Sequence, residues 1–555
     1  MRTKTLWLLP ALLVSSLALV AAGCGGDDES SSGTGATTGA GGAEAANQVI
    51  TVNWGTEPPS LDPGLATDTT SSNILLNIMD PLIKLGDDLQ PVGSAAESFK
   101  TSDDGKTVTY VLRDGLKWTN GDPVTAHDFE YSWKRTVSPE LGADYAYQFY
   151  GIVGAQEYNS CDPKKDDCDA LADKMGVKAV DDKTLEVTLT EPQPWFLQQM
   201  AHSSFLAVNK ATVEKYGDKW TEPKNIVTNG PFKLEAWEHN SRIDIVKDPK
   251  WRGADGVKLT RVNGRMITDG ITAVQAFEAG EVDVLYQGLP SSEISRLKDT
   301  PEYEVYPGLG TYYYGINVKN IPDPKQRRAM SLAIPRQSII DNVAQGGQLP
   351  ATGFTPKGMP GFDTINPASK WLPAEADVEQ AKQLMSEVAN PKTKITLYLN
   401  DTPPNPDIAV AVKAAFKEIG IDSTIKSQEF AQYLEFLGPP PNKDVDVYRL
   451  GWVGDFVDAI NFLDLWTCDS GNNNTNYCNK DYDATIKKAK STIDNDARYK
   501  VYGEAEDILF GDNGDVPVMP IYFYTYPNLE RENIKATFDV NLLNQTDLTS
   551  VVVTK

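Results

Sequence analysis

Patterns typical of β-strands and of α-helices alternate along almost the whole chain, with glycine and proline between them. Residues 106–113 alternate polar and apolar side chains, which is typical of a half-buried strand. A helix is predicted over 271–279 and a strand over 282–286, and the same order recurs with a helix over 407–419 and a strand through Ile425. No repeat of roughly 20–50 residues, the mark of a solenoid, is evident. The alternation predicts an α/β fold.

One helix has a clear start signal. Thr125 and Asp128 have the spacing of a capping box, in which each residue satisfies a backbone N–H group of the other. Phe129, Trp133 and Val137 then recur every four residues, which places them on one face of a helix. We therefore predict an amphipathic helix that begins after Thr125.

Length and charge limit the class of protein. At about 150 residues per domain, 555 residues allow three or four domains. Hydrophobic residues make up 40% and charged residues 23%, a balance that excludes a disordered chain. With 52 basic and 77 acidic residues the formal net charge is −25, which disfavours binding to nucleic-acid phosphates.

The first residues are typical of a secretion signal. Arg2 and Lys4 precede an apolar run over 6–20, which is too short for a membrane span and fits the core of a signal peptide. We predict a signal peptide over 1–23 and a protein that acts outside the cytoplasm. No later apolar stretch is long enough to cross a membrane.

Small residues followed by Cys24 resemble the bacterial lipobox, although Ala21 stands where leucine is usual. The resemblance implies a lipid anchor on Cys24 in the cell membrane; the alternative is ordinary cleavage near Ala22. Residues 24–48 are rich in Gly, Ala, Ser and Thr and have almost no bulky apolar side chains, as is typical of flexible tethers. The globular part is expected to begin near Val49.

The remaining cysteines form two close pairs. In an oxidising compartment, local disulfides Cys161–Cys168 and Cys468–Cys478 are the economical interpretation. Metal binding is the alternative, but it would need CxxC spacing or nearby histidines. The histidines are scattered at His127, His202 and His239.

Catalytic signatures are missing from the sequence. It contains no GxSxG, HExxH, Walker or GxGxxG motif. Counting acidic residues does not show whether the chain has the catalytic carboxylate pair of a glycosidase, because acidic residues are numerous. We predict a binding protein with no cofactor, no metal and no enzymatic activity.

Six ordered segments of the sequence carry a family resemblance. They are EPPSLDPG (57–64), YVLRDGLKWTNGDPVTAHDFEYSWKR (110–135), NIVTNGPFKLEAW (225–237), AGEVDVLY (279–286), GTYYYGIN (310–317) and YRLGWVGDFVDAINFL (448–463). Together they resemble the peptide-binding branch of the family 5 extracellular solute-binding proteins that serve ABC importers. The likeness covers essentially everything from about Thr51 to the C-terminus.

The resemblance implies a two-lobed α/β fold of the class II periplasmic-binding-protein type, with one extra inserted domain. The lobes are expected to close over a ligand about a hinge near Gly308–Thr311 and Tyr524–Tyr526. The expected parts are lobe I (49–79, 226–309 and 526–555), an inserted domain II (80–225) and lobe II (310–525).

The family pairs an aspartate with the free amine of a peptide, and the matching residue here is Asp455. A carboxylate that becomes buried on closure needs a cation, which the amine supplies. The simpler interpretation is a loop aspartate that accepts backbone N–H groups. The backbone of 450–453, which includes Gly451, Trp452 and Val453, would pair with the peptide as a neighbouring strand does. Trp452 would also wall a side-chain pocket, unless it belongs to the core.

Other positions match the family's ligand cavity, including a loop over 66–70 that would pair with the peptide's other edge. For each aromatic residue among them, core packing is an equal alternative. These positions are Tyr145, Tyr313, Phe430, Leu434, Tyr524, Thr67 and Thr69.

At the far end of the peptide, Arg449 matches one of the basic residues that catch the carboxylate. Leu437 and Asn405 stand where the family has basic residues, and 343–348 contains no charge. The preferred peptide length is therefore open.

A disulfide of the family between the YYY and GW segments is also absent. Gly310 and Val453 occupy its two positions, so both partners are missing together.

These expectations describe a monomeric, lipid-anchored binding protein that captures oligopeptides and delivers them to an ABC permease. The first alternative is another solute: a modified or cell-wall peptide, an oligosaccharide or a metal complex. The second is a secreted hydrolase.

Overall fold

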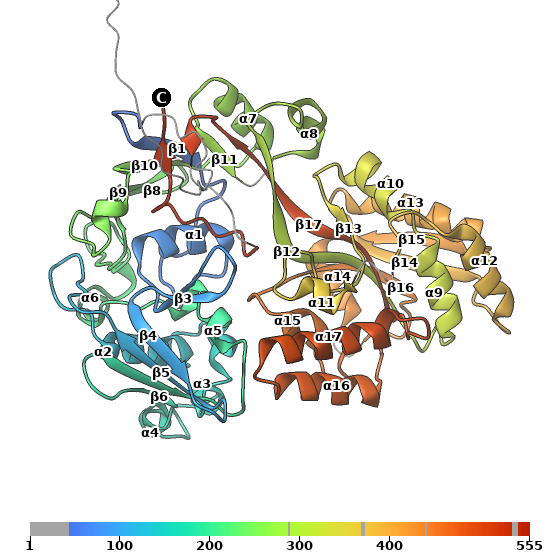
Figure 1. The fold of residues 1–555 in the computed structure, drawn as a ribbon, viewed down its shortest axis with the longest axis horizontal. Helices are drawn as coiled ribbons and strands as arrows, with labels where there is room; N and C mark the ends of the chain where they lie inside the picture. Colours follow the sequence, from blue (N-terminus) through green and yellow to red (C-terminus); the bar gives the residue numbers. More distant parts are fainter. Residues whose placement is uncertain (1–43, 287–288, 368–371, 439–440, 536–541) are drawn as a thin grey trace, which may run out of the picture. The chain divides into compact units, whose positions relative to one another are not determined.

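The computed structural model describes residues 44–286, 289–367, 372–438, 441–535 and 542–555 (Figure 1). Cys24 and the predicted signal peptide lie outside the described residues. Among the residues that are described, no helix has the length and apolar character needed to span a membrane.

The largest sheet has eleven strands within the described residues, in the order β15-β14-β16-β12-β17-β11-β1-β10-β9-β8, with β13 paired to β17. Its strands are β1 (Val49–Asn53), β8 (Phe232–Glu238), β9 (Arg242–Lys247), β10 (Arg261–Arg265), β11 (Val284–Tyr286), β12 (Tyr303–Ile316), β13 (Leu349–Pro350), β14 (Lys394–Asn400), β15 (Asp422–Gln428), β16 (Val447–Val453) and β17 (Val518–Glu530).

Two long neighbouring strands, β12 and β17, join the halves of this sheet (Figure 1). Residues Tyr303–Pro307 of β12 pair with 525–529 of β17, and the register shifts before Thr311 pairs with Phe523. The shift falls on the segment where the hinge is expected. β18 (Ile534–Lys535) and β19 (Val552–Val553) form a separate pair.

A four-stranded antiparallel sheet, β4-β5-β7-β6, organises the segment predicted as the inserted domain. Its core includes Trp133 and Phe149. The strands of this segment are β2 (Ile83–Leu85), β3 (Pro91–Gly93), β4 (Ala96–Thr101), β5 (Thr107–Leu112), β6 (Val177–Ala179) and β7 (Thr184–Thr188).

Most helices lie between successive strands, as the sequence pattern predicts for an α/β fold. The α-helices are α1 (Thr69–Ile78), α2 (Ala126–Val137), α3 (Ala155–Asn159), α4 (Cys168–Asp173), α5 (Phe196–Gln199), α6 (Lys210–Tyr216), α7 (Gly270–Glu278), α8 (Ser291–Leu297), α9 (Pro324–Leu332), α10 (Arg336–Ile339), α11 (Phe362–Ile365), α12 (Val378–Glu387), α13 (Asn405–Glu418), α14 (Phe430–Leu437), α15 (Ile460–Leu463), α16 (Lys480–Lys490) and α17 (Asn495–Phe510). Short turns of other helix types are η1 (Asp144–Phe149), η2 (Ser203–Phe205), η3 (Gly217–Lys219), η4 (Ala254–Gly256), η5 (Ile340–Ala344) and η7 (Asp464–Trp466).

Local sequence signals are confirmed where they are strongest. Helix α2 begins after Thr125, whose backbone N–H donates to the Asp128 carboxylate at 2.8 Å. Phe129, Trp133 and Val137 are fully buried. The predicted helix–strand orders appear as α7 followed by β11 and as α13 followed by β15.

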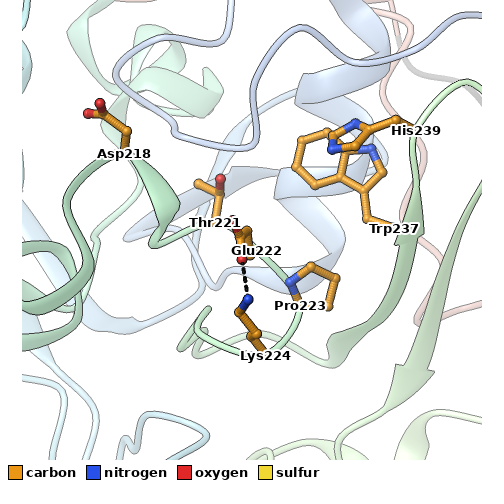
Figure 2. Close-up of a pocket in the computed structure, with 7 residues that line it drawn as sticks. All are labelled: Asp218, Thr221, Glu222, Pro223, Lys224, Trp237 and His239. Carbon is orange, nitrogen blue, oxygen red and sulfur yellow. Dashed lines mark ion pairs between the residues drawn. The ribbon is translucent and has the colours of Figure 1, made fainter.

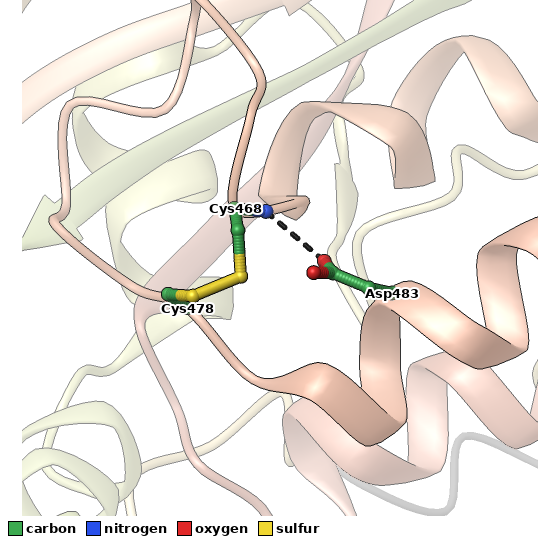
Figure 3. Close-up of side chains that lie close together, drawn as sticks. All are labelled: Cys468, Cys478 and Asp483. Carbon is green, nitrogen blue, oxygen red and sulfur yellow. Dashed lines mark hydrogen bonds between the residues drawn. A yellow bond between two sulfur atoms is a disulfide. The ribbon is translucent and has the colours of Figure 1, made fainter.

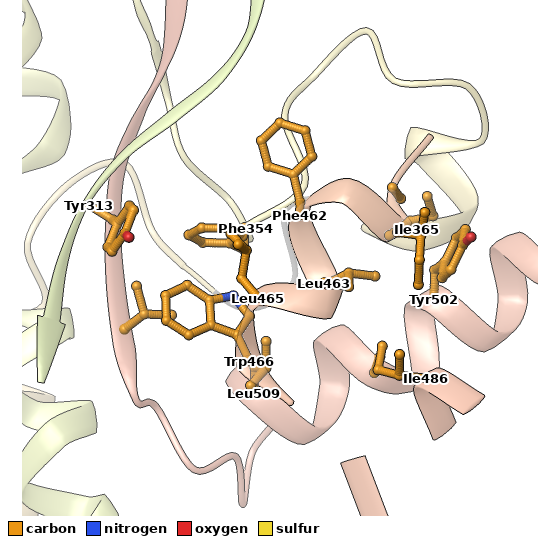
Figure 4. Close-up of a cluster of buried hydrophobic side chains, with 14 of the residues drawn as sticks. Tyr313, Phe354, Ile365, Phe462, Leu463, Leu465, Trp466, Ile486, Tyr502 and Leu509 are labelled. Carbon is orange, nitrogen blue, oxygen red and sulfur yellow. The ribbon is translucent and has the colours of Figure 1, made fainter. Parts of the chain in front are cut away.

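The tyrosines of β12 divide between two cores, because side chains alternate across a strand. Tyr313 packs with Phe354 and Trp466, on the side covered by α15, α16 and α17 (Figure 4). Tyr312 and Tyr314 belong to the other core, which includes residues of α9 and α13. The sheet between these cores carries β16, the strand that leads to Asp455.

Two expected boundaries differ from the structure. The linker was expected to run to residue 48, but the Gln48 side chain donates to Val553 O and accepts from Val553 N, and Glu44 forms an ion pair with Lys258. Polar contacts of this kind leave no hydrophobic signal in the sequence. Leu206, Val208 and Trp220, assigned to the inserted domain, instead pack in the core formed around β1 and α1.

Candidate functional site

Asp455 lies just after β16, on a loop that begins at Gly454. The Gly454 N–H donates to Leu309 O of β12 at 2.9 Å, which fixes the start of the loop beside the central strands. Gly454 has no room for a side chain, because a Cβ atom there would lie 2.8 Å from Leu309 Cδ2. The half-buried carboxylate of Asp455 forms no ion pair with any described residue.

The electrostatics of Asp455 suit a cationic partner. Burial raises the pKa of Asp455, and the nearby Asn461 side chain only partly opposes this shift. The shift means that the protein itself supplies too little compensation for the negative charge. A bound ammonium group would supply it.

Several predicted positions come within electrostatic range of Asp455. Burial raises the pKa of Tyr145, and the charges of Asp455 and Asp68 add to the effect. Asp68 stands between Thr67 and Thr69, whose side chains are exposed. Asp455 and Asp68, the residue that caps the start of α1, therefore both lie near Tyr145.

The β16 strand offers backbone groups on one edge. It pairs with β12 over all its residues, Val447–Val453, but with β14 only at Val447 and Tyr448. The Tyr433 hydroxyl donates to Arg449 O at 2.7 Å, and beyond Arg449 β12 is the one described strand that pairs with β16. The predicted segment 450–453 can therefore accept an added strand.

Arg449 is held in an aromatic and amide surrounding. Its Nη1 donates to Asn400 Oδ1 and its Nη2 to the Tyr524 hydroxyl, both at 3.1 Å. The guanidinium lies 4.2 Å from the centre of the Tyr312 ring. Its Nε is buried without a partner, and Arg449 has no ion pair within the described residues. No described carboxylate therefore neutralises the charge of Arg449.

Gly451 and Gly310 make room for Tyr524. A Cβ atom on Gly451 would lie 2.2 Å from the Tyr524 hydroxyl, and one on Gly310 would lie 2.4 Å from the ring. Gly310 also pairs directly with Val453 in the sheet. The two positions of the family's missing disulfide are therefore neighbours, which supports the alignment of the two segments.

The predicted cavity residues differ in exposure. Tyr313 follows the core-packing alternative: its side chain is 2% exposed and lies in the core, because strand alternation turns it away from Arg449. Phe430, Leu434 and Val453 are exposed at 46%, 42% and 58%. Large apolar side chains left this accessible are available to a ligand. Trp452 is partly buried beside the core, and its indole N–H donates to Asn461.

The positions that lack the family's basic residues are both buried. Leu437 is 2% exposed and belongs to the core. Asn405 accepts from the Tyr312 hydroxyl at 3.1 Å and donates to Asn400 Oδ1 at 3.0 Å, so it joins the network that holds Arg449.

Sequence reasoning missed four contributors to the site. Tyr147 is 46% exposed, and burial followed by the charge of Asp455 raises its pKa. Tyr312 and Asn400 support Arg449, and Asn461 contacts both Trp452 and Asp455. Only Tyr147 had a usable signal, since it follows Tyr145 in the same aromatic segment.

A cavity of about 510 Å³ lies elsewhere, where Trp237 and His239 face Thr221 and the Glu222–Lys224 ion pair (Figure 2). None of the predicted site residues lines it. The Trp237 indole N–H donates to the Glu57 carboxylate, and this bond fixes the orientation of the Trp237 ring in the cavity wall.

Both predicted cysteine pairs are disulfides in the structure. Cys468 and Cys478 lie close to Asp483, and the Cys468 N–H donates to this carboxylate at 3.0 Å (Figure 3). Since the sulfur atoms are bonded to each other, they do not offer thiolates to a metal.

Comparison with known proteins identifies the family. The model described as bacterial extracellular solute-binding proteins, family 5 (middle), matches residues 90–474. The oligopeptide-binding protein OppA of Bacillus subtilis (strain 168) is 34% identical over 550 residues, which cover 96% of each chain. Both the name of this relative and the almost complete coverage of the two chains agree with the resemblance found in the sequence segments.

Solved structures agree. The periplasmic murein tripeptide-binding protein MppA, in its unliganded open form, superposes with a TM-score of 0.82 at 30% identity, covering 92% of this chain and 98% of that one. Haemophilus influenzae OppA in complex with the peptide RPPGFSPFR gives a TM-score of 0.69 at 29% identity, covering 92% and 100%. The predicted class, a two-lobed α/β binding-protein fold, is confirmed. The chain belongs to the family 5 bacterial extracellular solute-binding proteins.

Proposed function

We propose that this protein captures oligopeptides outside the cytoplasm and delivers them to an ABC transporter permease. The observation that carries the proposal is Asp455, a half-buried carboxylate with no ion pair in the described part of the chain and a raised pKa. A peptide's free α-amine provides a cation and hydrogen-bond donors in one group. The named peptide-binding relatives support the same ligand class.

The peptide backbone would bind along β16 beyond Arg449, where β12 is the one described strand that pairs with it. Strand addition recognises main-chain groups, so different sequences would be accepted. Side chains of the peptide would contact Phe430, Leu434 and Trp452. Thr67, just before α1, and Thr69, its first residue, would approach the opposite edge of the peptide, near Tyr145.

Arg449 would attract the peptide's carboxylate as a cation that no described carboxylate neutralises. Asn400 and Tyr524 orient the guanidinium without neutralising it. Since Leu437 and Asn405 are buried and uncharged, they add no second anchor. The proposed ligand is a peptide whose length allows it to reach Arg449 from Asp455.

The membrane anchor is the remaining part of the proposal. A diacylglyceryl group on Cys24 would hold the protein at the membrane next to its permease. The lipobox-like residues before Cys24 support it. Mass spectrometry of protein from the membrane fraction should show a lipid-modified Cys24 at the N-terminus, and Cys24→Ser should release the protein from the membrane.

Calorimetric titration would test the ligand. Protein stripped of carried ligand by unfolding and refolding is titrated with di- to pentapeptides, each paired with its N-acetylated twin. Native protein should bind the free peptides and not their acetylated twins. The Asp455→Asn variant should lose this preference for the free amine. Binding that ignores acetylation would contradict the amine anchor.

The alternatives are outcomes of the same experiment. If no peptide binds, native mass spectrometry of freshly purified protein should reveal the solute actually carried, such as a modified peptide, an oligosaccharide or a metal complex. Hydrolysis of a peptide on prolonged incubation would favour the hydrolase.

A further inference from the structure

The cavity beside Trp237 takes no part in the function proposed above (Figure 2). Its volume of about 510 Å³ is within the range of roughly 300–1,000 Å³ that is typical of small-molecule sites. Trp237, near the end of β8, and His239, just after it, form the aromatic part of the wall. The polar part comes from η3 and the loop that follows it, and it includes Asp218, Thr221 and Glu222.

Glu57 fixes the aromatic part of this wall. Its carboxylate accepts from the Trp237 indole N–H at 2.9 Å and from the Asn240 N–H at 2.8 Å. It also lies 2.6 Å from His239 Nδ1. Burial raises the pKa of Glu57, but these hydrogen bonds outweigh burial and lower it, so the carboxylate is ionised. An ionised carboxylate only accepts, so His239 Nδ1 carries the proton, and Nε2 of the neutral ring is an acceptor.

The lining is rich in acceptors and in negative charge. The face of a tryptophan ring attracts cations, and a carboxylate bonded to the indole N–H polarises the ring in the direction that strengthens this attraction. Asp218 has no ion pair with any described residue. Glu222 pairs with Lys224 at 2.9 Å, but an exposed pair of this kind is weak and opens easily. The cavity therefore suits a cation that brings several hydrogen-bond donors.

Another tryptophan of the protein has the same arrangement with the cation in place. The Trp251 indole N–H donates to the Asp80 carboxylate at 3.4 Å, and the Arg252 guanidinium lies 4.9 Å from the centre of the Trp251 ring. Arg252 also donates to both Asp80 oxygens, at 3.0 and 3.2 Å. Within the described part of the chain, no lysine or arginine lies over the Trp237 ring. At Trp237 the indole and its carboxylate are present, and the cation has to come from outside.

We propose that this cavity binds a guanidinium group, with its planar face on the Trp237 ring and its N–H donors toward Asp218 and Glu222. A guanidinium has five donors in one plane, so it stacks on an aromatic ring and bonds carboxylates at its edge at the same time. An ammonium group is a compact point charge without such a face. The site therefore selects a guanidinium over an ammonium group and over a neutral molecule of the same shape.

Nuclear magnetic resonance of the indole N–H groups tests the inference on the full-length protein. Its 11 tryptophans are labelled with ¹⁵N, and Trp237→Phe and Trp251→Phe identify two of the signals. The probes are n-butylguanidinium, n-butylammonium and n-butylurea, the neutral planar counterpart, at constant ionic strength. Butylguanidinium should shift the Trp237 signal with an affinity about tenfold above that of butylurea, as expected for hydrogen bonds between charged groups. Butylammonium should fall between them, and the Trp251 signal should not move, because Arg252 already covers that ring.

Variants of the lining should change this affinity in opposite directions. Asp218→Asn should weaken butylguanidinium several-fold, because it removes a charge and keeps the shape of the side chain. Lys224→Met should strengthen it several-fold, because Glu222 loses the cation that competes with the ligand. Asp255→Asn is the matched control for Asp218→Asn: Asp255 is exposed and does not line the cavity, so the affinity should stay unchanged.

Several results would overturn the inference. Butylurea or butylammonium that binds as tightly as butylguanidinium would remove the selection, and an equal shift of the Trp251 signal would show unspecific binding. Unchanged affinity in both Asp218→Asn and Lys224→Met would remove the role of the carboxylates. Far-ultraviolet circular dichroism and the melting temperature establish that each variant is folded.

One further probe distinguishes the source of the guanidinium. N-acetylarginine methylamide represents an arginine within a polypeptide. A shift of the Trp237 signal by this probe and by butylguanidinium supports a site that also accepts the side chain of another protein. A shift by butylguanidinium alone supports a site for a free solute.

Discussion

Two aspartates on the same loop have opposite surroundings. Asp458 is 4% exposed and bonded to Arg498, Tyr502 and a backbone N–H group. Asp455, three positions earlier in the sequence, has no ion pair with any described residue, and burial raises its pKa. The protein satisfies one carboxylate completely and leaves the other to a partner from outside.

The difference separates structural from functional polar groups. A buried ion pair with all its hydrogen bonds holds a loop in place, and breaking it leaves an uncompensated charge. An unpaired carboxylate costs stability in the free protein, and a ligand that brings a cation recovers that cost. The first aspartate fixes the geometry with which the second binds.

The largest expected effect comes from breaking the Asp458 pair. Arg498→Ala should lower the free energy of unfolding by about 3–5 kcal/mol, because both partners are almost fully buried. Denaturant unfolding followed by tryptophan fluorescence measures it. Lys488→Ala removes the exposed pair with Glu504 and should cost under about 1 kcal/mol. Equal losses of unfolding free energy in Arg498→Ala and Lys488→Ala would contradict a special structural role for the buried pair.

Asp455→Asn should act on binding instead of folding. Peptide affinity should fall about 10- to 100-fold, since a hydrogen bond between charged groups is lost. The melting temperature of the ligand-free variant should stay level or rise, because the uncompensated charge has been removed. Titration calorimetry and thermal unfolding on one preparation measure both. A fall in melting temperature like that of Arg498→Ala would make Asp455 a structural residue.

The pH dependence sharpens the same distinction. The pKa of Asp455 is raised in the folded protein, so the folded state holds this proton more readily than the unfolded state. The stability contribution of the group therefore improves as pH falls through its raised pKa. Peptide affinity changes in the opposite direction, because a proton competes with the amine. Affinity measured from pH 7 downward should decline for native protein and stay flat for Asp455→Asn.

The smallest effect is expected at Arg449. Arg449→Lys keeps the charge but loses the planar group that Asn400 and Tyr524 orient. Affinity for peptides with a free carboxylate should fall several-fold, and the preference over their C-terminal amides should decrease. Binding of the amide forms should change little. If Arg449→Lys keeps the full preference for peptides with a free carboxylate, the peptide carboxylate does not bind at Arg449.

Parts of the fold could be predicted because their signals are local. The capping box, the strand alternation and the glycine stops predict α2, β5 and α7 to within one or two residues. The ordered segments identify the family, and the GWVGD segment points to Asp455. Local spacing also predicts both disulfides.

Other features could not be predicted because their partners are distant in the sequence. Asp455 and Asp458 look alike in the sequence, and only the fold brings Arg498 to one of them. The alternation along β12 predicts that Tyr312 and Tyr313 face opposite ways, but not that Tyr312 is the one beneath Arg449. The sequence by itself therefore determined the family, the α/β order and the candidate anchor. Only the tertiary structure decided which charges are satisfied, because satisfaction depends on contacts between residues far apart along the chain.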